Sequence, residues 1–321
     1  MRLFLSVIPL IGAAIAQSRT TAPSGALVVG NGGKYKTISS AVNAAKAGSV
    51  IFVLPGKYNE QVYVPANKGA LTIMGSTPDA SSYEKNQVTI SARNSQANKP
   101  NNDETGTLRV KNDGFKLYNI NVENTWGKGS QALALSAYGK SQGFYGCGFF
   151  GFQDTVMPND GSQYFSKCLI TGATDFIFGQ KSLAWFEKCD IGVRNGGKYI
   201  TANGRDSNSN PSFYVINNSK VTAAKGESVP AGSYFLGRPW RSYSRVVFQN
   251  TELSNVINGA GWSVWQSSEP NTKNVYYGEY KNTGPGAEGR RASFSKKLSS
   301  AVPITQILGG TYKTWVDAAY L

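Results

Sequence analysis

The sequence predicts an all-β fold, a β-solenoid whose chain coils through successive rungs of short strands. The main observation is a 21-residue period that separates Cys147, Cys168 and Cys189. A phenylalanine lies three places before each cysteine, and an aspartate lies seven places after each of the first two. A fixed period in the low twenties is typical of solenoids, in which residues one period apart stack on neighbouring rungs. Charged residues make up 16% of the chain, below the usual ~25%, as expected when long ladders are buried.

The first predicted element after the N-terminal region is a short helix that would close the open end of the solenoid. Thr37 is a suitable N-cap, and Ile38, Ala41, Val42 and Ala45 lie on one face of the helix that follows. A cap of this kind covers strand edges that the first rung would otherwise expose.

Short strands are predicted along most of the remaining chain, where β-branched and aromatic residues recur between Gly and Asn turns. The predicted strands are residues 50–54, 61–64, 71–74, 115–122, 132–135, 144–150, 164–170, 176–178, 183–186, 213–216 and 246–248. The long polar segment 76–103 predicts a surface excursion. The C-terminal residues 302–321 predict a tail or helix that packs along the solenoid.

Residues 1–16 predict a secretory signal peptide, because a basic start and an apolar run end in Ala14-Ile15-Ala16. An anchoring helix is the alternative, but the run is short and contains Pro9 and Gly12. We therefore expect residues 17–321 to form a single secreted, extracellular solenoid domain that is not held in a membrane, and we expect a monomer.

The cysteines and one sequon bear on processing of a secreted chain. Stacked cysteines would lie close enough for one disulfide, Cys147–Cys168 or Cys168–Cys189. A ladder of buried free thiols is the equal alternative. Asn217-Asn218-Ser219 is the one N-glycosylation sequon.

The net charge of +14 narrows the class of partner. A secreted protein this basic favours polyanions, such as acidic polysaccharides, anionic surfaces or free nucleic acid. Solubility alone is the other interpretation of the same charge.

The repeat also predicts a pair of carboxylates, because Asp154 and Asp175 are 21 residues apart. Stacked carboxylates are costly unless one is protonated or a cation compensates. Such a pair can supply a nucleophile and a general acid, and Arg238 is a candidate cation. Turn-capping aspartates are the structural alternative. The chain contains no histidine, which removes the main competing catalytic arrangements.

Two glutamines lie near the aspartates in the repeat. Gln153 directly precedes Asp154, and Gln131 lies 22 residues earlier, close to one rung away. Amide groups can donate to an oxyanion. An internal amide ladder is the alternative interpretation.

Five segments in order make the sequence resemble the pectin methylesterase (pectinesterase) family, in its compact secreted microbial or fungal type. They are Gly56-Lys57-Tyr58-Asn59-Glu60, Gln131-Ala132-Leu133-Ala134-Leu135, Gly151-Phe152-Gln153-Asp154-Thr155, Asp175-Phe176-Ile177-Phe178-Gly179 and Leu236-Gly237-Arg238-Pro239-Trp240. The resemblance implies a right-handed parallel β-helix that removes methyl esters from the galacturonate units of pectin, without a metal or organic cofactor and without a nucleic-acid partner.

The resemblance also implies a role for each matched residue. Asp175 matches the nucleophile that forms an acyl-enzyme, and Asp154 matches the general acid and base. Gln131 and Gln153 match the oxyanion donors, and Arg238 matches the arginine that orients and charges the nucleophile. Trp240 and Phe178 match aromatic residues that contact the sugar chain, and Tyr138 and Trp265 are further candidates.

Two other kinds of function are possible on a solenoid of this kind: cleavage of the polymer chain by a lyase or a polygalacturonase, and binding without catalysis. Pectate lyases usually need an acidic calcium cluster, and polygalacturonases carry a Gly-His-Gly segment that a chain without histidine cannot have. A catalytically silent polysaccharide-binding solenoid would have lost some of the matched polar residues, and all are present.

Overall fold

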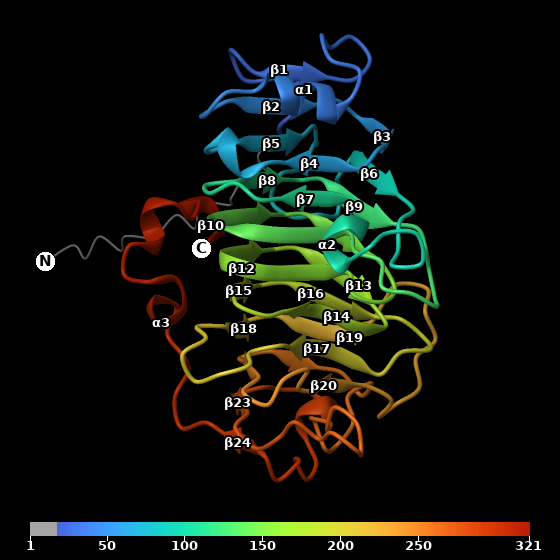
Figure 1. Ribbon diagram of the computed structural model, residues 1–321, viewed down its shortest axis with the longest axis vertical. Coiled ribbons are helices and arrows are strands. Elements are labelled where there is room, and N and C mark those ends of the chain that lie inside the picture. Colours follow the sequence, from blue (N-terminus) through green and yellow to red (C-terminus); the bar gives the residue numbers. More distant parts are fainter. Residues whose placement is uncertain (1–17) are drawn as a thin grey trace, which may run out of the picture.

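The computed structural model describes residues 18–321, so the predicted signal peptide at residues 1–16 lies outside the described residues. The strands stack along one long axis, and the chain runs from β1 at one end to β24 at the other (Figure 1). Neighbouring strands pair in parallel, one turn of the coil apart. The coil is a right-handed parallel β-helix, which confirms the predicted fold class.

Each turn of the coil crosses three faces. The long face contains β1 (Leu27–Val29), β2 (Val50–Val53), β5 (Thr72–Gly75), β8 (Lys116–Tyr118), the last residues of β10 (Leu135–Tyr145) and β12 (Val156–Ser166), β15 (Leu183–Glu187), β18 (Phe213–Asn217), β21 (Arg245–Gln249), β23 (Tyr276–Tyr280) and β24 (Ser295–Lys297). The second face contains β4 (Val62–Val64), β7 (Leu108–Val110), the first residues of β10 and β12, β14 (Thr174–Gly179), β17 (Tyr199–Asn203) and β20 (Phe235–Gly237). The third face contains β3 (Gly56–Asn59), β6 (Val88–Ala92), β9 (Asn121–Asn124), β11 (Gly148–Phe150), β13 (Leu169–Gly172), β16 (Asp190–Val193), β19 (Lys220–Ala223) and β22 (Glu252–Leu253).

The 21-residue period corresponds to one rung in the middle of the coil. Phe144 pairs with Phe165, and Phe165 pairs with Phe186. Their rings stack inside the coil with centroids 4.6 Å apart at each step. Beyond this point the spacing widens, and Phe186 pairs with Ile216. Loops inserted between the later strands cause the wider spacing, so the repeat is visible in only part of the sequence.

The three cysteines stack inside the coil and are buried free thiols, which agrees with the thiol ladder and not with the alternative of one disulfide. The Cys147 thiol contacts the carbonyl of Tyr145 at 3.4 Å, and the Cys168 thiol contacts that of Ser166 at 3.3 Å. Each of these thiols therefore contacts a backbone carbonyl on its own rung. The side chains have the same orientation on successive rungs, so the sulfurs stack without a covalent bond.

Asn217, the acceptor of the one sequon, lies in a buried hydrogen-bond network that disfavours glycosylation. It ends β18 with only 7% of its surface exposed. Its Nδ2 donates to Glu187 at 2.8 Å, and its Oδ1 accepts from Gln249 and Asn250 at 3.0 Å each. A glycan on Nδ2 would have to displace this buried network.

Helix α1 (Ile38–Ala44) covers the β1 end of the coil, as predicted (Figure 1). The Thr37 side chain accepts from the Ser40 amide at 3.1 Å as the N-cap. The Glu60 carboxylate accepts from the amides of Ile38 and Ser39 at 2.7 and 2.9 Å. The first of the five motifs therefore serves to hold the cap rather than to carry chemistry.

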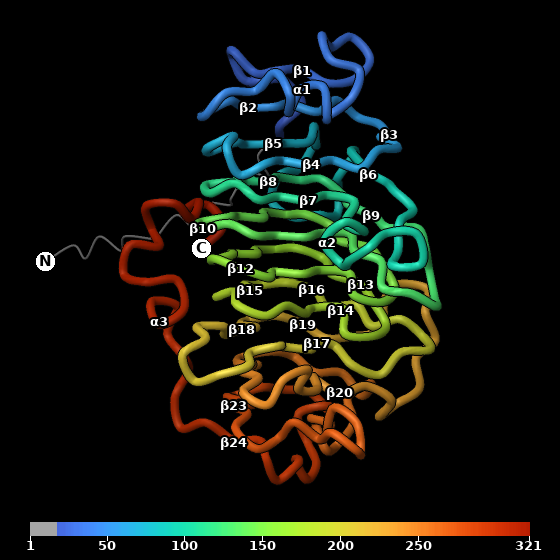
Figure 2. The backbone as a smooth tube through the Cα atoms, in the orientation of Figure 1, coloured from blue at the N-terminus to red at the C-terminus, as the bar shows by residue number. Residues whose placement is uncertain are grey.

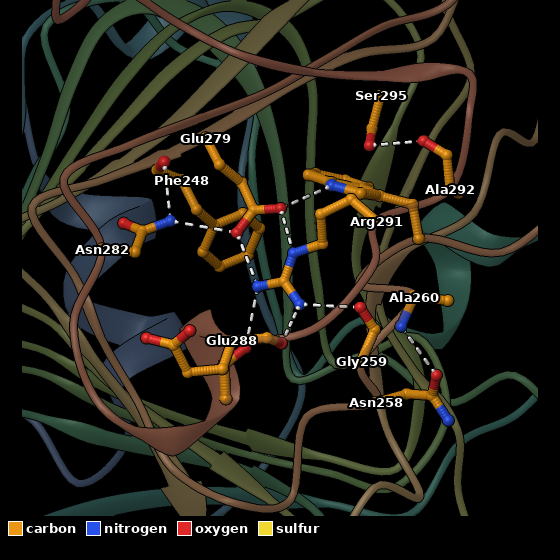
Figure 3. Close-up of polar contacts among 12 residues, drawn as sticks. Phe248, Asn258, Gly259, Ala260, Glu279, Asn282, Glu288, Arg291, Ala292 and Ser295 are labelled. Atoms are coloured by element: carbon orange, nitrogen blue, oxygen red, sulfur yellow. Dashed lines mark hydrogen bonds and ion pairs between the residues drawn. The ribbon is translucent and has the colours of Figure 1, made fainter.

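Arg291 lies between the last strands of the coil, β23 and β24, and Figure 3 shows its polar contacts. Its guanidinium pairs with both oxygens of Glu279 at 2.8 and 3.0 Å and also donates to the carbonyls of Gly259 and Glu288. One partly buried ion pair thus ties together several loops that would otherwise leave the last rung open.

The C-terminal tail runs along the outside of the long face, as Figure 2 shows. It forms short helical pieces: α3 (Ile304–Leu308), η3 (Tyr312–Thr314) and η4 (Ala318–Tyr320). Tyr320 docks it, because its carbonyl accepts from Tyr164 and Ser166 at 2.8 and 2.7 Å. The predicted packing of the tail is confirmed.

The segment 76–103 is not only a surface excursion. It contains β6, whose Val88 and Ile90 are fully buried in the core, and it leads into α2 (Asn102–Thr105). The further short helices are η1 (Ala66–Lys68) and η2 (Pro285–Ala287). In the sequence, Val88 and Ile90 alternate with a single polar residue. This pattern is too short to predict a strand between polar flanking segments.

Candidate active site

Asp154 and Asp175 lie side by side at the corner where the chain passes from the third face to the second face. The preceding residues, Gln153 and Thr174, form a parallel bridge. The Asp154 amide donates to the Thr174 carbonyl at 3.0 Å. The adjacency that the 21-residue spacing predicts is therefore present.

Both aspartates have a left-handed backbone, with φ of 64° at Asp154 and 50° at Asp175. Asp is one of the few side chains that tolerates this region, and such strain is concentrated at functional sites. Each residue has only 6% of its surface exposed. The corner thus holds two carboxyl groups in a fixed, nearly water-free position.

Arg238, which directly follows β20, pairs with Asp175 through a two-point contact. Its Nε and Nη2 lie 2.9 and 2.6 Å from Oδ1 and Oδ2 of Asp175. Its guanidinium carbon lies 4.1 Å from the ring centre of Tyr199 and 4.0 Å from that of Trp265. The two rings fix the plane of the guanidinium, and the fork fixes the carboxylate of Asp175.

The environment separates the proton affinities of the two carboxyl groups. Burial raises the pKa of Asp154 well above its usual range, and the adjacent charge of Asp175 raises it further, against a smaller opposing effect of Arg238. Burial also raises the pKa of Asp175, but the hydrogen bonds and charge of Arg238 oppose that rise. Asp154 therefore keeps its proton at a pH where Asp175 is ionised.

Gln131 and Gln153 lie one rung apart beside the aspartates. The Ala132 amide donates to the Gln153 carbonyl at 3.2 Å, which places the two glutamines on neighbouring rungs. Both are half-buried. Their position beside the carboxyl pair suits donors to an oxyanion better than an internal amide ladder, which would be fully enclosed.

The four aromatic residues singled out in the sequence belong to one cluster on the outside of the second face. Phe178 is buried there with Leu133, Met157 and Ala202, and the partly exposed members are Tyr138, Trp240 and Trp265. The rings of Phe178 and Trp240 lie 6.2 Å apart and are tilted by 54°. The cluster forms an apolar surface beside the carboxyl pair, suited to the faces of sugar rings.

One glycine is needed for this surface. A Cβ on Gly204 would lie 2.6 Å from Cε3 of the Trp240 ring. The small residue directly after β17 therefore lets the indole lie close to the backbone.

Sequence reasoning missed two residues of the site. Tyr199 stacks on Arg238, and Lys111 places its ammonium 3.2 Å from the ring centre of Tyr138 while pairing with Asp103 at 2.7 Å. Tyr199 pairs with Thr174 on the neighbouring rung of the second face. This rung has 25 residues instead of 21, so the 21-residue spacing does not predict the position of Tyr199.

Within residues 18–321 there is no group of three or more His, Cys, Asp or Glu side chains that could hold a metal ion. In the same part of the chain, no helix is long and apolar enough to cross a bilayer.

Comparison with known proteins places these features in a family. A family model described as Pectinesterase matches residues 26–302. A pectinesterase of Aspergillus niger is 49% identical over 316 residues, which cover 96% of each chain. The crystal structure of a pectin methylesterase from Aspergillus niger superposes with a TM-score of 0.89 at 41% identity, covering 95% of this chain and 100% of that one. A pectin methylesterase from carrot gives a TM-score of 0.82 at 31% identity, with coverage of 95% and 98%.

Proposed function

The chain belongs to the pectinesterase family and hydrolyses the methyl esters of pectin, and we propose that it does so through an acyl-enzyme formed on Asp175. The main support is the forked contact of Arg238 with Asp175. Asp175 lies beside Asp154, a second carboxyl group whose pKa is raised well above its usual range. Arg238 keeps Asp175 charged and aims its oxygen, and Asp154 supplies the proton that the leaving group needs.

In the first half of the reaction, an oxygen of Asp175 attacks the carbonyl carbon of a galacturonate methyl ester. The carbonyl electrons move to the oxygen, and the amide N–H groups of Gln131 and Gln153 donate to the resulting oxyanion. As the tetrahedral intermediate collapses, Asp154 gives its proton to the methoxy oxygen. Methanol leaves, and an anhydride joins Asp175 to the sugar carboxyl group.

In the second half, Asp154 is a carboxylate and takes a proton from water. The oxygen of that water attacks the same carbonyl carbon, and the second tetrahedral intermediate releases Asp175 as a carboxylate. The sum is ester plus water giving acid plus methanol, and both aspartates return to their starting states.

The aromatic cluster holds the polymer over the carboxyl pair. Phe178 and Trp240 give an apolar floor, and Tyr138 and Trp265 flank it. A solved pectin methylesterase that is 26% identical, with a TM-score of 0.73, is described in complex with a hexasaccharide. This supports a groove that binds several sugar units at once.

We also infer where the enzyme acts. The apolar N-terminal run with its Ala14-Ile15-Ala16 end supports secretion, and the substrate is a polymer of the plant cell wall. The protein is an extracellular monomer that modifies or degrades wall pectin, without nucleic-acid or membrane partners. Size-exclusion chromatography with light scattering tests the monomer, and a dimer mass would contradict it.

The test of the reaction compares three products on highly methylated pectin. Methanol should accumulate while the polymer length stays constant and no unsaturated, ultraviolet-absorbing product appears. Shortened chains would indicate a polygalacturonase, and ultraviolet absorbance would indicate a lyase. Pectin binding without any product would indicate a silent binding solenoid.

A further inference from the structure

A cleft of about 610 Å³ lies beside the catalytic groove and carries only positive charge. Its lining includes four cationic side chains and two tyrosines: Arg205, Arg245, Lys273, Lys296, Tyr243 and Tyr276. No Asp or Glu is among its lining residues. Positive charge gathered without acids in a concave site favours an anionic ligand.

Arg205 is the most enclosed of these cations, with 6% of its surface exposed. It donates to the carbonyls of Asn208, Asn210 and Tyr243 at 2.7, 2.7 and 3.2 Å. The nearest acid in sequence, Asp206, instead accepts from Asn210 and Ser207. The backbone therefore holds the Arg205 guanidinium in place without neutralising its charge.

Arg245 is held in the same way at the start of β21. Its Nε and Nη2 donate to the carbonyls of Ser212 and Pro211 at 3.0 and 2.6 Å. Its guanidinium carbon lies 4.4 Å from the ring centre of Phe213. Burial and, to a smaller extent, the neighbouring charge of Arg205 lower the pKa of Arg245 to about 10.

Most of the other partly buried arginines in the described part of the chain are paired with acids, and the exception is Arg19, which donates to Asn119 at 2.8 Å. Arg109, Arg194, Arg238 and Arg291 each lie within 3 Å of a carboxylate oxygen. At these four positions the fold supplies a carboxylate partner of its own. Two adjacent shielded arginines without one mark a place where the anion comes from outside the chain.

The cleft adjoins the catalytic groove. Tyr243 lies three residues after Trp240 and donates its amide to the Arg205 carbonyl at 3.2 Å. Gly204, which precedes Arg205, lies against the Trp240 ring. A polymer that leaves the aromatic surface past Trp240 therefore reaches this cleft within a few sugar units.

We propose that this basic cleft is a second binding site for galacturonan, which takes the carboxylates of a segment that has already lost its methyl esters. This inference rests on the proposed function, because that reaction supplies the carboxylates. Arg205 and Arg245 provide fixed guanidinium donors, and Lys273 and Lys296 add mobile charge at the rim. The cleft holds product next to the groove while the following esters are hydrolysed.

The test uses the full secreted chain and unmethylated hexagalacturonate at low salt. The variant Lys273→Gln/Lys296→Gln removes two exposed rim charges and leaves the buried arginines in place. The control Lys46→Gln/Lys313→Gln removes two exposed lysines elsewhere. It is matched to the cleft variant, because Lys313 lies over the ring of Tyr312 as Lys296 lies over the ring of Tyr276. Calorimetry should show affinity reduced about three- to tenfold in the cleft variant and unchanged in the control. Equal affinity in the two variants would overturn the proposal.

Lysine footprinting by acetylation and mass spectrometry locates the ligand without any substitution. Hexagalacturonate should protect Lys273 and Lys296 but not Lys46 or Lys313, and unprotected cleft lysines would show that the ligand occupies the groove alone. Methanol release from methylated pectin is scored in the same preparation. Methanol release with unprotected lysines refutes only the second site, whereas absent methanol refutes the proposed function whatever the footprint shows.

Discussion

The guanidinium of Arg238 donates to both carboxylate oxygens of Asp175, at 2.9 Å from Nε and 2.6 Å from Nη2. These residues are 63 positions apart in the chain, and the coil brings β20 beside the corner that carries Asp175. The contact orients one carboxylate and favours its charged form. In the mechanism that we propose, this difference makes Asp175 the nucleophile and Asp154 the acid.

The variant Arg238→Lys should lose most activity, because an ammonium cannot reproduce the planar fork or lie between Tyr199 and Trp265. We expect kcat to fall by about 10²-fold or more. The weaker pair should also let the pKa of Asp175 rise, so the acidic limb of the pH profile of kcat/KM should move to higher pH. Arg241→Lys, at an exposed position three residues after Arg238, is the control. An unchanged rate and acidic limb would make Arg238 a bystander.

The variant Asp154→Asn should abolish turnover and stabilise the fold at neutral pH. The folded state raises the pKa of Asp154 above the unfolded value of about 3.9. The stability that this gives is present below pH ~3.9 and is lost as the pH rises through the folded pKa. The advantage in Tm of the asparagine variant over the wild type should therefore be small near pH 4 and grow toward pH 7. Calorimetric scans across this range test it, and a constant difference would contradict the pKa shift.

The variant Glu60→Gln should destabilise the capped end of the coil. Glu60 accepts from two amides at the start of α1 and from Ser39 Oγ at 2.5 Å. Loss of its charge should cost about 1–3 kcal/mol in the free energy of unfolding, with kcat per folded molecule unchanged. Glu84→Gln, at an exposed position, is the matched control in denaturant titrations. Equal midpoints for the two variants would show that the cap does not depend on this carboxylate.

Reducing agents should leave the Tm unchanged, because Cys147, Cys168 and Cys189 are free. Thiol titration of the denatured, unreduced protein should find all three sulfhydryl groups, while the native protein should react slowly because each is buried. A count of one thiol, together with a lower Tm after reduction, would indicate a disulfide.

The fold was predictable from the sequence where one rung equals one period. Phe144, Phe165 and Phe186 stack because the corners between them have constant length. Where loops are inserted the period disappears, so Tyr199 and the buried strand β6 could not be located from spacing. The burial of Asn217 was equally hidden, because its partners lie 30 and 32 residues away on other rungs.

The site was predictable in part for the same reason. The spacing of Asp154 and Asp175 predicts their contact directly, whereas the contact of Arg238 depends on a loop whose path no local pattern specifies. Arg238 was a candidate cation by its residue type, and the motif resemblance supplied its role and the aromatic positions. The unpaired arginines of the basic cleft had no sequence signal, because the absence of a carboxylate partner is visible only in three dimensions.

The most direct measurement is methanol release from highly methylated pectin by the purified wild type and by Asp175→Asn, with pectin binding measured beside it. We expect methanol release by the wild type alone, and we expect Asp175→Asn to retain pectin binding and the wild-type Tm. Methanol release near the wild-type rate from Asp175→Asn would contradict the nucleophile assignment, and absence of release from both would contradict the reaction itself.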